Sequence, residues 1–176
     1  MNLAGLASNR GRNLAHLADQ APGGAKLAVV LSDVADAPVL DAAAERGVPT
    51  ETVVPEDDAG RRAHDRRVVA ALADYDVDLV CLDGYMRILS EAFLDAMPTT
   101  LNVHPSLLPA FPGADAWGDA LDAGVRVTGC TVHVVVDAVA ADGSVVTDRV
   151  DAGPVLTQEA VPVYADDDRA SLKERV

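Results

Sequence analysis

An asparagine and a histidine stand two residues apart in the segment N-V-H-P-S-L-L-P, at Asn102 and His104. On an extended strand, side chains two residues apart point the same way. An amide donor beside an imidazole can stabilise an oxyanion and move a proton. A capping asparagine and a histidine at the edge of the core are the structural alternative. Because two prolines stiffen the loop that follows, the motif as a whole favours a catalytic pair.

A carboxylate stands at the predicted tight turn V-D-A-G-P, where Asp151 precedes a strand. A buried aspartate can hold an imidazole in one orientation and favour its protonated form. An Asx turn is the commoner fate of an aspartate before glycine. Only proximity to His104 would favour a catalytic role, and the sequence does not show that distance.

The segment S-N-R-G-R-N, residues 8–13, joins a predicted strand to a predicted helix. Gly11 lets the backbone approach a ligand closely, and the free N–H groups of a helix start attract an anion, typically phosphate. Arg10 and Arg12 add positive charge. The segment lacks the Gly-Lys-Ser/Thr end of a P-loop and the G-x-G-x-x-G of a dinucleotide fold. An anion site and an ordinary polar turn are therefore equal alternatives here.

The segment D-G-Y-M-R-I-L-S, residues 83–90, also follows a predicted strand. An apolar loop with one arginine, Arg87, suits a flat heteroaromatic ligand that carries a carboxylate. In the structural alternative, Met86, Ile88 and Leu89 pack inward and Ser90 caps a helix.

The remaining histidines and the two cysteines offer less chemistry. His16 and His64 lie among polar neighbours on predicted helices and are expected to be solvated, whereas His133 lies in a valine-rich strand as a core or wall residue. No cluster has the spacing of a metal site. Cys81 and Cys130 lie in apolar runs and are expected to be reduced, which favours a cytoplasmic location.

Near-continuous Val/Leu runs alternate with helical patterns over the front two-thirds of the chain. This order predicts an open, mostly parallel twisted α/β sheet with helices on both faces. Such sheets bind ligands at the carboxyl ends of their strands, where the loops above begin. We expect strands over 3–7, 26–32, 50–54, 78–82 and 101–103, and helices over 13–20, 37–46, 60–74 and 91–97.

The back third has a different pattern. We expect a long strand over 127–137, and an extra β-hairpin near 137–151 that turns at Asp142-Gly143. A further strand over 154–163 and a helix over 115–123 complete the set. Aspartates at 166–168 can cap a final helix that has barely begun at Val176.

The chain has 176 residues, which fits one domain, and its hydrophobic fraction of 49% excludes a disordered chain. Its 28 acidic and 14 basic residues give a net charge of -14, which argues against binding to nucleic acid or anionic membranes. No apolar run reaches the roughly 18 residues of a membrane span, and the N-terminus lacks the pattern of a secretory signal.

The composition also bears on the source of the protein, because aromatic residues make up only 3% of the chain. A small-residue core under an Asp-rich surface favours a halophilic source, with a GC-rich genome as the alternative.

Taken together and in order, these motifs resemble one family. The helix-opening G-R-N, G-Y-M-R-I-L-S, N-V-H-P-S-L-L-P-A-F-P-G, T-G-C-T-V-H and D-A-G-P-V are similar to those of the phosphoribosylglycinamide formyltransferases, the folate-dependent glycinamide ribonucleotide transformylases of purine synthesis. H-P-S-L-L-P alone occurs across the formyltransferase superfamily. The following F-P-G, without the arginine-glycine of the methionyl-tRNA enzymes, favours the glycinamide ribonucleotide branch.

The resemblance implies a Rossmann-like fold and three sets of site residues. The substrate phosphate would be held by Gly11, Arg12 and Asn13. The folate would be contacted by Arg61, Met86, Arg87, Ile88, Leu89 and Asn102. The catalytic residues would be Asn102, His104 and Asp151.

In the implied reaction, the amine of glycinamide ribonucleotide attacks the formyl carbon of the co-substrate 10-formyltetrahydrofolate. Asn102 and protonated His104 stabilise the oxyanion, Asp151 supports His104, and no metal is needed. As partners we expect these two small molecules, and neither nucleic acid nor a membrane. We expect the chain to form a homodimer or to be fused to another purine-pathway domain. The alternatives are a 10-formyltetrahydrofolate hydrolase, a formyltransferase for another amine, and an inactive folate- or nucleotide-binding domain.

The chain departs from the family pattern in three places. Residues 114–117 replace the histidines that often follow F-P-G. The segment between Val136 and Asp151 is longer than usual, so the assignment of Asp151 depends on the D-A-G-P match. The family also continues into a C-terminal helix with a glutamate that helps to hold the ribonucleotide. We therefore expect a single formyltransferase domain over residues 1–176 that is truncated within this helix. Either the chain is a fragment of a longer or fused protein, or its substrate binding is incomplete.

Overall fold

Apolar runs of Val and Leu form the inner strands of one seven-stranded sheet in the computed structural model, which describes residues 1–56 and 60–176. The strands are β1 (Asn2–Leu6), β2 (Lys26–Ser32), β3 (Thr50–Thr52), β4 (Leu79–Leu82), β5 (Thr100–His104), β6 (Val127–Val134) and β7 (Val155–Pro162). The helices are α1 (Arg12–Gln20), α2 (Pro38–Ala44), α3 (Arg61–Leu72), α4 (Glu91–Leu94), α5 (Ala116–Asp122) and α6 (Arg169–Arg175), with 3-10 turns η1 (Pro22–Gly24) and η2 (Thr147–Arg149).

The strand order is β3-β2-β1-β4-β5-β6-β7, and the sheet is mostly parallel as predicted. The strands from β3 to β5 pair in parallel, whereas β6 pairs antiparallel with both β5 and β7. From β1 the chain first builds outward to β2 and β3 and then crosses to β4 on the other side. Such a reversal of strand order opens a crevice at the carboxyl ends of the strands, where α/β proteins bind ligands.

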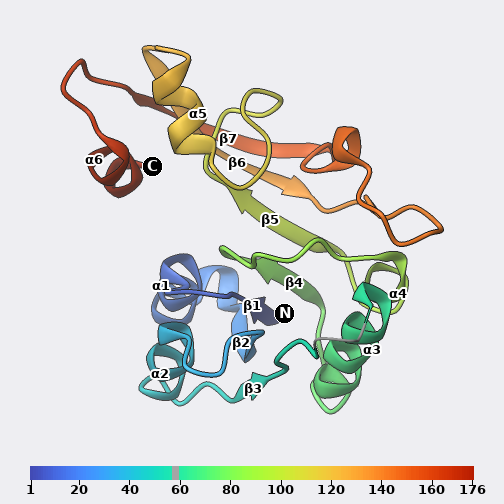
Figure 1. Ribbon diagram of the computed structural model, residues 1–176. Helices are drawn as coiled ribbons and strands as arrows, with labels where there is room; N and C mark the ends of the chain where they lie inside the picture. The colour runs from blue at the N-terminus through green and yellow to red at the C-terminus, as the bar shows by residue number, and fades with distance from the viewer. Residues whose placement is uncertain (57–59) are drawn as a thin grey trace.

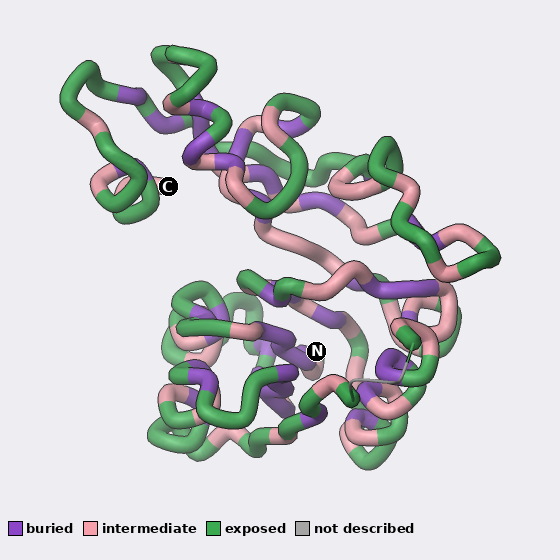
Figure 2. Tube along the Cα trace, viewed as in Figure 1, coloured by how far each residue is buried: buried purple, intermediate pink, exposed green. Residues whose placement is uncertain are grey.

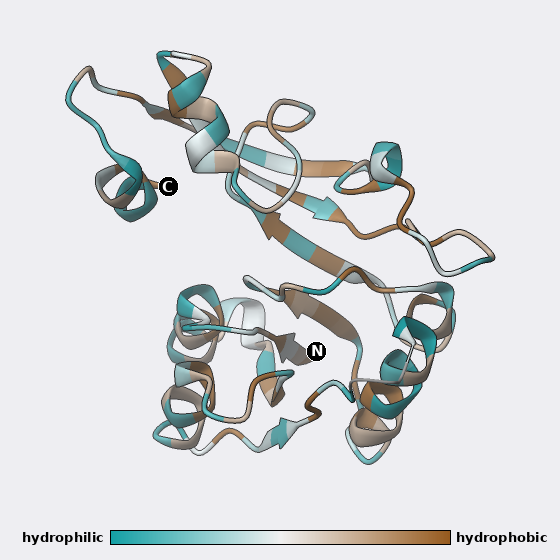
Figure 3. Cartoon of the chain, viewed as in Figure 1, coloured by the Kyte–Doolittle hydropathy of each residue, from teal (hydrophilic) through white to brown (hydrophobic). Residues whose placement is uncertain are grey.

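Helices cover both faces of the sheet, with α1 and α2 on one side and α3 and α4 on the other (Figure 1). Strand β2 serves both layers, because Val29 and Leu31 belong to the apolar cluster under α3 and Val30 to the cluster under α1. Figure 3 shows the inner strands in hydrophobic brown, and Figure 2 shows the edge strand β7 exposed along most of its length. The central strands therefore form a rigid base for the loops at their ends.

The segment after β6 differs in detail from the expected long strand and hairpin. Strand β6 ends at Val134, and the hairpin is a single antiparallel bridge between Val139 and Val145, followed by η2. Local side-chain bonds replace a longer ladder, since Asp137 and Asp142 accept hydrogen bonds from backbone N–H groups two residues ahead. The prediction of a strand to residue 137 was wrong for this reason.

His64 corrects another expectation. The sequence placed it in solvent, but its side chain is fully buried where α3 packs against the loop after β4, with Nε2 3.3 Å from the hydroxyl of Tyr85. His16 is exposed on α1, as expected. None of the helices in the described residues is long and apolar enough to cross a membrane.

Candidate active site

Strand β5 presents Asn102 and His104 on the same side, two residues apart, at its carboxyl end. It lies between the parallel strand β4 and the antiparallel strand β6, so both neighbours hold its backbone. The side chain of His104 is buried, with 4% exposed, whereas Asn102 is half-buried and faces a pocket. The predicted pair is thus fixed by the sheet and not by a mobile loop.

Asp151 lies beside His104, which the sequence could not show. Its Oδ2 is 3.3 Å from Nδ1 of His104 and also accepts a hydrogen bond of 2.9 Å from the backbone N–H of Gly113. Asp151 has φ of 54°, in the left-handed region that aspartate tolerates better than most residues. The turn therefore aims the carboxylate back at β5, and Asn102, His104 and Asp151 form one cluster.

Both ring nitrogens of His104 face hydrogen-bond acceptors. Nε2 is 2.8 Å from the carbonyl oxygen of Phe111, and Nδ1 faces the carboxylate of Asp151. A carbonyl and an ionised carboxylate can only accept, so the arrangement is satisfied when both nitrogens carry a proton. The ring of His104 is therefore held between two acceptors, the carbonyl of Phe111 and the carboxylate of Asp151.

His133 joins this cluster from the opposite strand, directly across from Asn102 in the β5–β6 register. It is 2% exposed, and its Nε2 lies 3.1 Å from Nδ2 of Asn102 and 3.6 Å from Oδ1 of Asp151. Burial lowers the pKa of His133 below its ordinary value. The sequence indicated only a core or wall residue, because the pairing depends on an antiparallel register that no local motif reveals.

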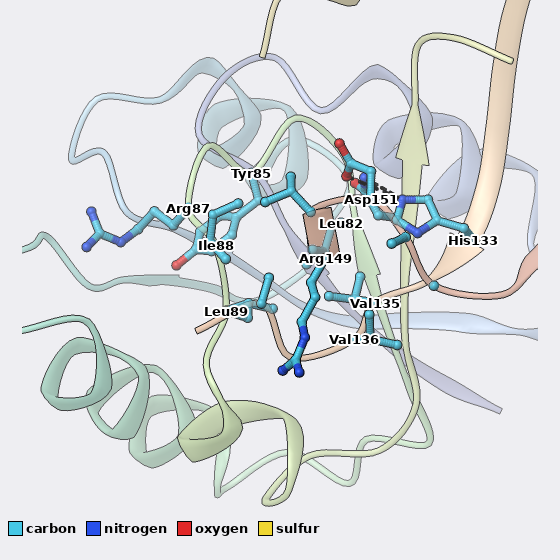
Figure 4. Close-up of a pocket in the computed structure, with 15 residues that line it drawn as sticks. Leu82, Tyr85, Arg87, Ile88, Leu89, His133, Val135, Val136, Arg149 and Asp151 are labelled. Carbon is cyan, nitrogen blue, oxygen red and sulfur yellow. Dashed lines mark hydrogen bonds and ion pairs between the residues drawn. The ribbon is translucent and has the colours of Figure 1, made fainter. Parts of the chain in front are cut away.

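A pocket opens beside this cluster, between the loops that follow β4 and β6 (Figure 4). Leucine, isoleucine and valine side chains supply its apolar wall, and Arg87 and Arg149 lie toward its outer parts, away from His133. The lining residues are Leu82, Tyr85, Arg87, Ile88, Leu89, Asn102, His133, Val135, Val136, Ala138, Arg149, Val150, Asp151, Ala152 and Gly153.

Three of the four residues predicted in the 86–89 segment line this pocket, namely Arg87, Ile88 and Leu89. Met86 is 61% exposed and stands outside the lining. Arg61, at the start of α3, also stands outside the lining and donates a 3.0 Å hydrogen bond to the carbonyl of Ile88. Arg149 is an additional cation that the sequence did not single out, because its segment had no expected ligand.

The predicted phosphate loop follows β1, next to the loop after β4. Gly11 has φ of 55°, and a Cβ there would lie 2.3 Å from Cγ2 of Val39, so only glycine fits. The carboxylate of Asp83 already accepts hydrogen bonds from the backbone N–H groups of Asn13 at 2.8 Å and Leu14 at 3.4 Å. Part of the helix start is thus satisfied from within the chain, a feature that sequence reasoning missed.

Across residues 1–56 and 60–176, no group of three His, Cys, Asp or Glu side chains is arranged to hold a metal ion. Cys81 and Cys130 are both free.

Comparisons with known proteins agree with this architecture. A family model described as Formyl transferase matches residues 1–176. The chain is 43% identical over 173 residues to phosphoribosylglycinamide formyltransferase of Mycobacterium tuberculosis, covering 97% of this chain and 75% of that protein. It is 41% identical over 178 residues to the trifunctional purine biosynthetic protein adenosine-3 of Bos taurus, covering 99% of this chain but only 16% of that relative's length. The crystal structure of glycinamide ribonucleotide transformylase 1 from Symbiobacterium toebii matches with a TM-score of 0.86 and 40% identity, covering 99% of this chain and 79% of that one.

Proposed function

The chain belongs to the formyl transferase family, and we propose that it transfers the formyl group of 10-formyltetrahydrofolate to the amine of glycinamide ribonucleotide in purine synthesis. The observation that carries the proposal is the convergence of Asn102, His104 and Asp151 beside an apolar pocket. The matching bacterial relative and the solved structure both bear the name of this activity.

Three side chains divide the catalytic work. As the amine attacks the formyl carbon, the carbonyl oxygen gains negative charge, which the amide of Asn102 and the imidazolium of His104 stabilise. The amine then loses a proton, the bond from the formyl carbon to the folate nitrogen breaks, and that nitrogen is protonated. His104 serves this transfer once its Nε2 exchanges the carbonyl of Phe111 for substrate, and Asp151 holds the ring in its orientation.

The pocket supports the choice of donor. Its apolar wall of Ile88, Leu89 and Val135 suits the flat rings of a folate, and Arg87 and Arg149 suit its carboxylates. Asn102 and His133 line the same pocket, so a donor bound there would place its formyl group beside the catalytic cluster.

The phosphate of the acceptor is assigned to the loop at Gly11, Arg12 and Asn13. Arg12 is exposed and free to approach a phosphate, and the dipole of α1 adds to its attraction. This loop and the loop after β4 flank the crevice where the strand order reverses, so one substrate can reach from one to the other.

We also propose a cytoplasmic location and assembly as either a homodimer or a fused enzyme. Free Cys81 and Cys130 suit a reducing compartment. The bovine relative carries its matching region within a much longer chain.

A formyl-transfer assay tests the proposal. Transfer should require both substrates, and His104→Ala should lower kcat by about 10²- to 10⁴-fold, the usual contribution of an acid–base residue. The control is His16→Ala, an exposed histidine on α1, which should stay within about twofold of the wild type. Near-normal turnover by His104→Ala, or release of formate without any amine, would overturn the proposal.

A further inference from the structure

His133 and Asn102 face each other across β5 and β6, and the bond between their side chains bears on the catalytic amide. We infer that neutral His133 is a positioning residue, which accepts a hydrogen bond from Nδ2 of Asn102 and so fixes which end of the amide faces the formyl oxygen. The inference rests on the proposed function for its role in catalysis, but its structural part stands on the hydrogen bonds alone.

The tautomer of His133 follows from its other nitrogen. Nδ1 lies 3.1 Å from the carbonyl oxygen of Val134, which can only accept, so Nδ1 carries the proton. In a neutral ring, Nε2 then has a lone pair and must receive a donor. Asn102 supplies that donor through Nδ2 at 3.1 Å. The reversed amide would instead set Oδ1 against the lone pair, with two acceptors in contact.

The Nδ2 amide nitrogen of Asn102 has two N–H groups. His133 accepts from one of them, so the other is available to donate to a ligand in the pocket. Among the described residues, His133 is the one hydrogen-bond partner of the Asn102 side chain, and Asn102 lines the pocket. An oxyanion-stabilising donor works best when it is oriented before the reaction, because it then costs no reorganisation. His133 therefore prepares the amide to donate.

The imidazole is itself held firmly. His133 is 2% exposed, and the Val134 carbonyl that accepts from Nδ1 is packed against Gly153, where a Cβ would lie 1.7 Å from that oxygen. Gly153 belongs to the same turn as Asp151. This one turn therefore supports both the His104–Asp151 pair and the Asn102–His133 pair. Any movement of this turn would disturb the two pairs together.

Protonation of His133 would reverse the arrangement. The titratable groups that face it are Asp151, with Oδ1 3.6 Å from Nε2, and His104 on β5. A proton on Nε2 would turn that nitrogen into a donor toward Asp151 and remove the acceptor of Asn102. Acid should therefore release the amide, and activity should fall as His133 titrates.

Two variants separate positioning from packing. His133→Leu fills the space without an acceptor and should lower kcat by about 10- to 100-fold, with each KM within about threefold, because a misplaced group costs up to that much. His133→Gln keeps an acceptor near the position of Nε2 without a titratable ring. It should recover at least about tenfold of the lost kcat and should lack the part of the acid limb that His133 causes.

The tautomer can be measured without any turnover. In ¹⁵N spectra of the imidazoles, the signals absent from His133→Gln identify His133 among the four histidines, and they should show a protonated Nδ1 and a bare Nε2 at neutral pH. A protonated Nε2 in the neutral ring would overturn the inference. So would an unchanged kcat in His133→Leu, or a loss in that variant that His133→Gln does not relieve. Absence of formyl transfer by the wild type would instead count against the proposed function and leave the tautomer measurement valid.

Discussion

At the scale of single residues, one carboxylate oxygen of Asp151 contacts both His104 and the loop that carries Phe111 and Gly113. Oδ2 of Asp151 lies 3.3 Å from Nδ1 of His104 and accepts a hydrogen bond from the N–H of Gly113, so the His104–Asp151 pair and the loop that carries Phe111 share an atom. A change at Asp151 should therefore alter both the orientation of His104 and the position of that loop.

Asp151→Asn removes the negative charge but keeps a residue that tolerates positive φ and an oxygen for Gly113. We expect kcat to fall by about 10²- to 10⁴-fold with small changes in KM, because the imidazolium of His104 loses its partner. Steady-state kinetics with both substrates measure this. Asp148→Asn, an exposed aspartate in the same segment, is the matched control, and an equal loss in both variants would contradict the role of Asp151.

A second residue-scale prediction concerns Asp83, whose carboxylate bonds the start of α1. Its charge should oppose a phosphate at the neighbouring Gly11 and Arg12. Asp83→Asn keeps an acceptor for the N–H of Asn13 and should lower the KM for the phosphorylated amine by about two- to fivefold, since charge at a helix end is worth about 0.3–1 kcal/mol. The KM for the folate donor serves as the internal control. A higher KM for the amine would show that the carboxylate mainly shapes the loop.

At the scale of elements, the strands could be read from the sequence more readily than the site. Strand β2 spans the predicted residues 26–32, because a run of apolar residues between a glycine pair and a polar turn marks a buried strand by itself. The pairing of Asn102 with His133 could not be read in this way, since it depends on how β6 turns back beside β5. The burial of His64 was also missed, because the packing of α3 on Tyr85 is a tertiary contact.

The turn after η2 should be sensitive to a single methyl group. Gly153→Ala would set a Cβ 1.7 Å from the carbonyl oxygen of Val134, a backbone atom that cannot move aside cheaply. We expect the free energy of unfolding to fall by about 1–3 kcal/mol, as in overpacked sites, and kcat to fall as Asp151 moves.

Gly60→Ala is the control for this change, because a Cβ at Gly60 meets no atom of the described residues within 4 Å and its φ is -61°. As a substitution at a helix N-cap it should cost no more than about 1 kcal/mol. Urea denaturation of both variants gives the comparison. Equal losses of stability would show that the contact with Val134 relaxes without strain.

At the scale of the whole molecule, the net charge of -14 and the anionic substrates of the proposed function are reconciled by where the cations lie. Two arginines, Arg87 and Arg149, stand at the pocket, whereas Arg62 and Arg67 on α3 pair with Glu91 and Glu56. The acidic excess is spread over the exposed surface, where salt screens it. On the proposed function, Arg87 and Arg149 would attract the carboxylates of the donor despite the overall charge.

Salt should stabilise this protein. Raising the salt from dilute buffer to molar concentration shortens the Debye length from about 30 Å to about 3 Å and screens the mutual repulsion of the aspartates. We expect Tm to rise over this range in a thermal melt followed by circular dichroism. A Tm that does not change with salt would remove the argument for adaptation to high salt.

Acid should destabilise the fold once salt has screened the surface. Burial lowers the pKa of both His64 and His133, so at mildly acidic pH the unfolded chain binds more protons than the folded chain does. Stability should therefore fall as the pH drops below about 6.5, the ordinary histidine value, toward the lower folded values. Thermal melts in molar salt from pH 7.5 to 5.5 should show this decline. His64→Gln and His133→Gln should each reduce the slope of Tm against pH, whereas the exposed-site variant His16→Gln should not. Equal slopes in all three variants would contradict the assignment of the decline to the two buried histidines.

The long segment between His133 and Asp151 connects the pocket wall to the outer surface of the molecule. Its middle is fastened to α3, where Arg62 donates hydrogen bonds to the carbonyls of Ala140 at 2.9 Å and Ala141 at 3.4 Å, and its last part brings Arg149 and Asp151 to the pocket wall. Because loop closure costs only about 0.6 kcal/mol for each doubling of length, such a segment can vary in length while these two attachments stay in place. The exposed side chain of Ala141, beside the attachment to α3, is therefore a suitable position for a fluorescent reporter that senses occupancy of the pocket from outside.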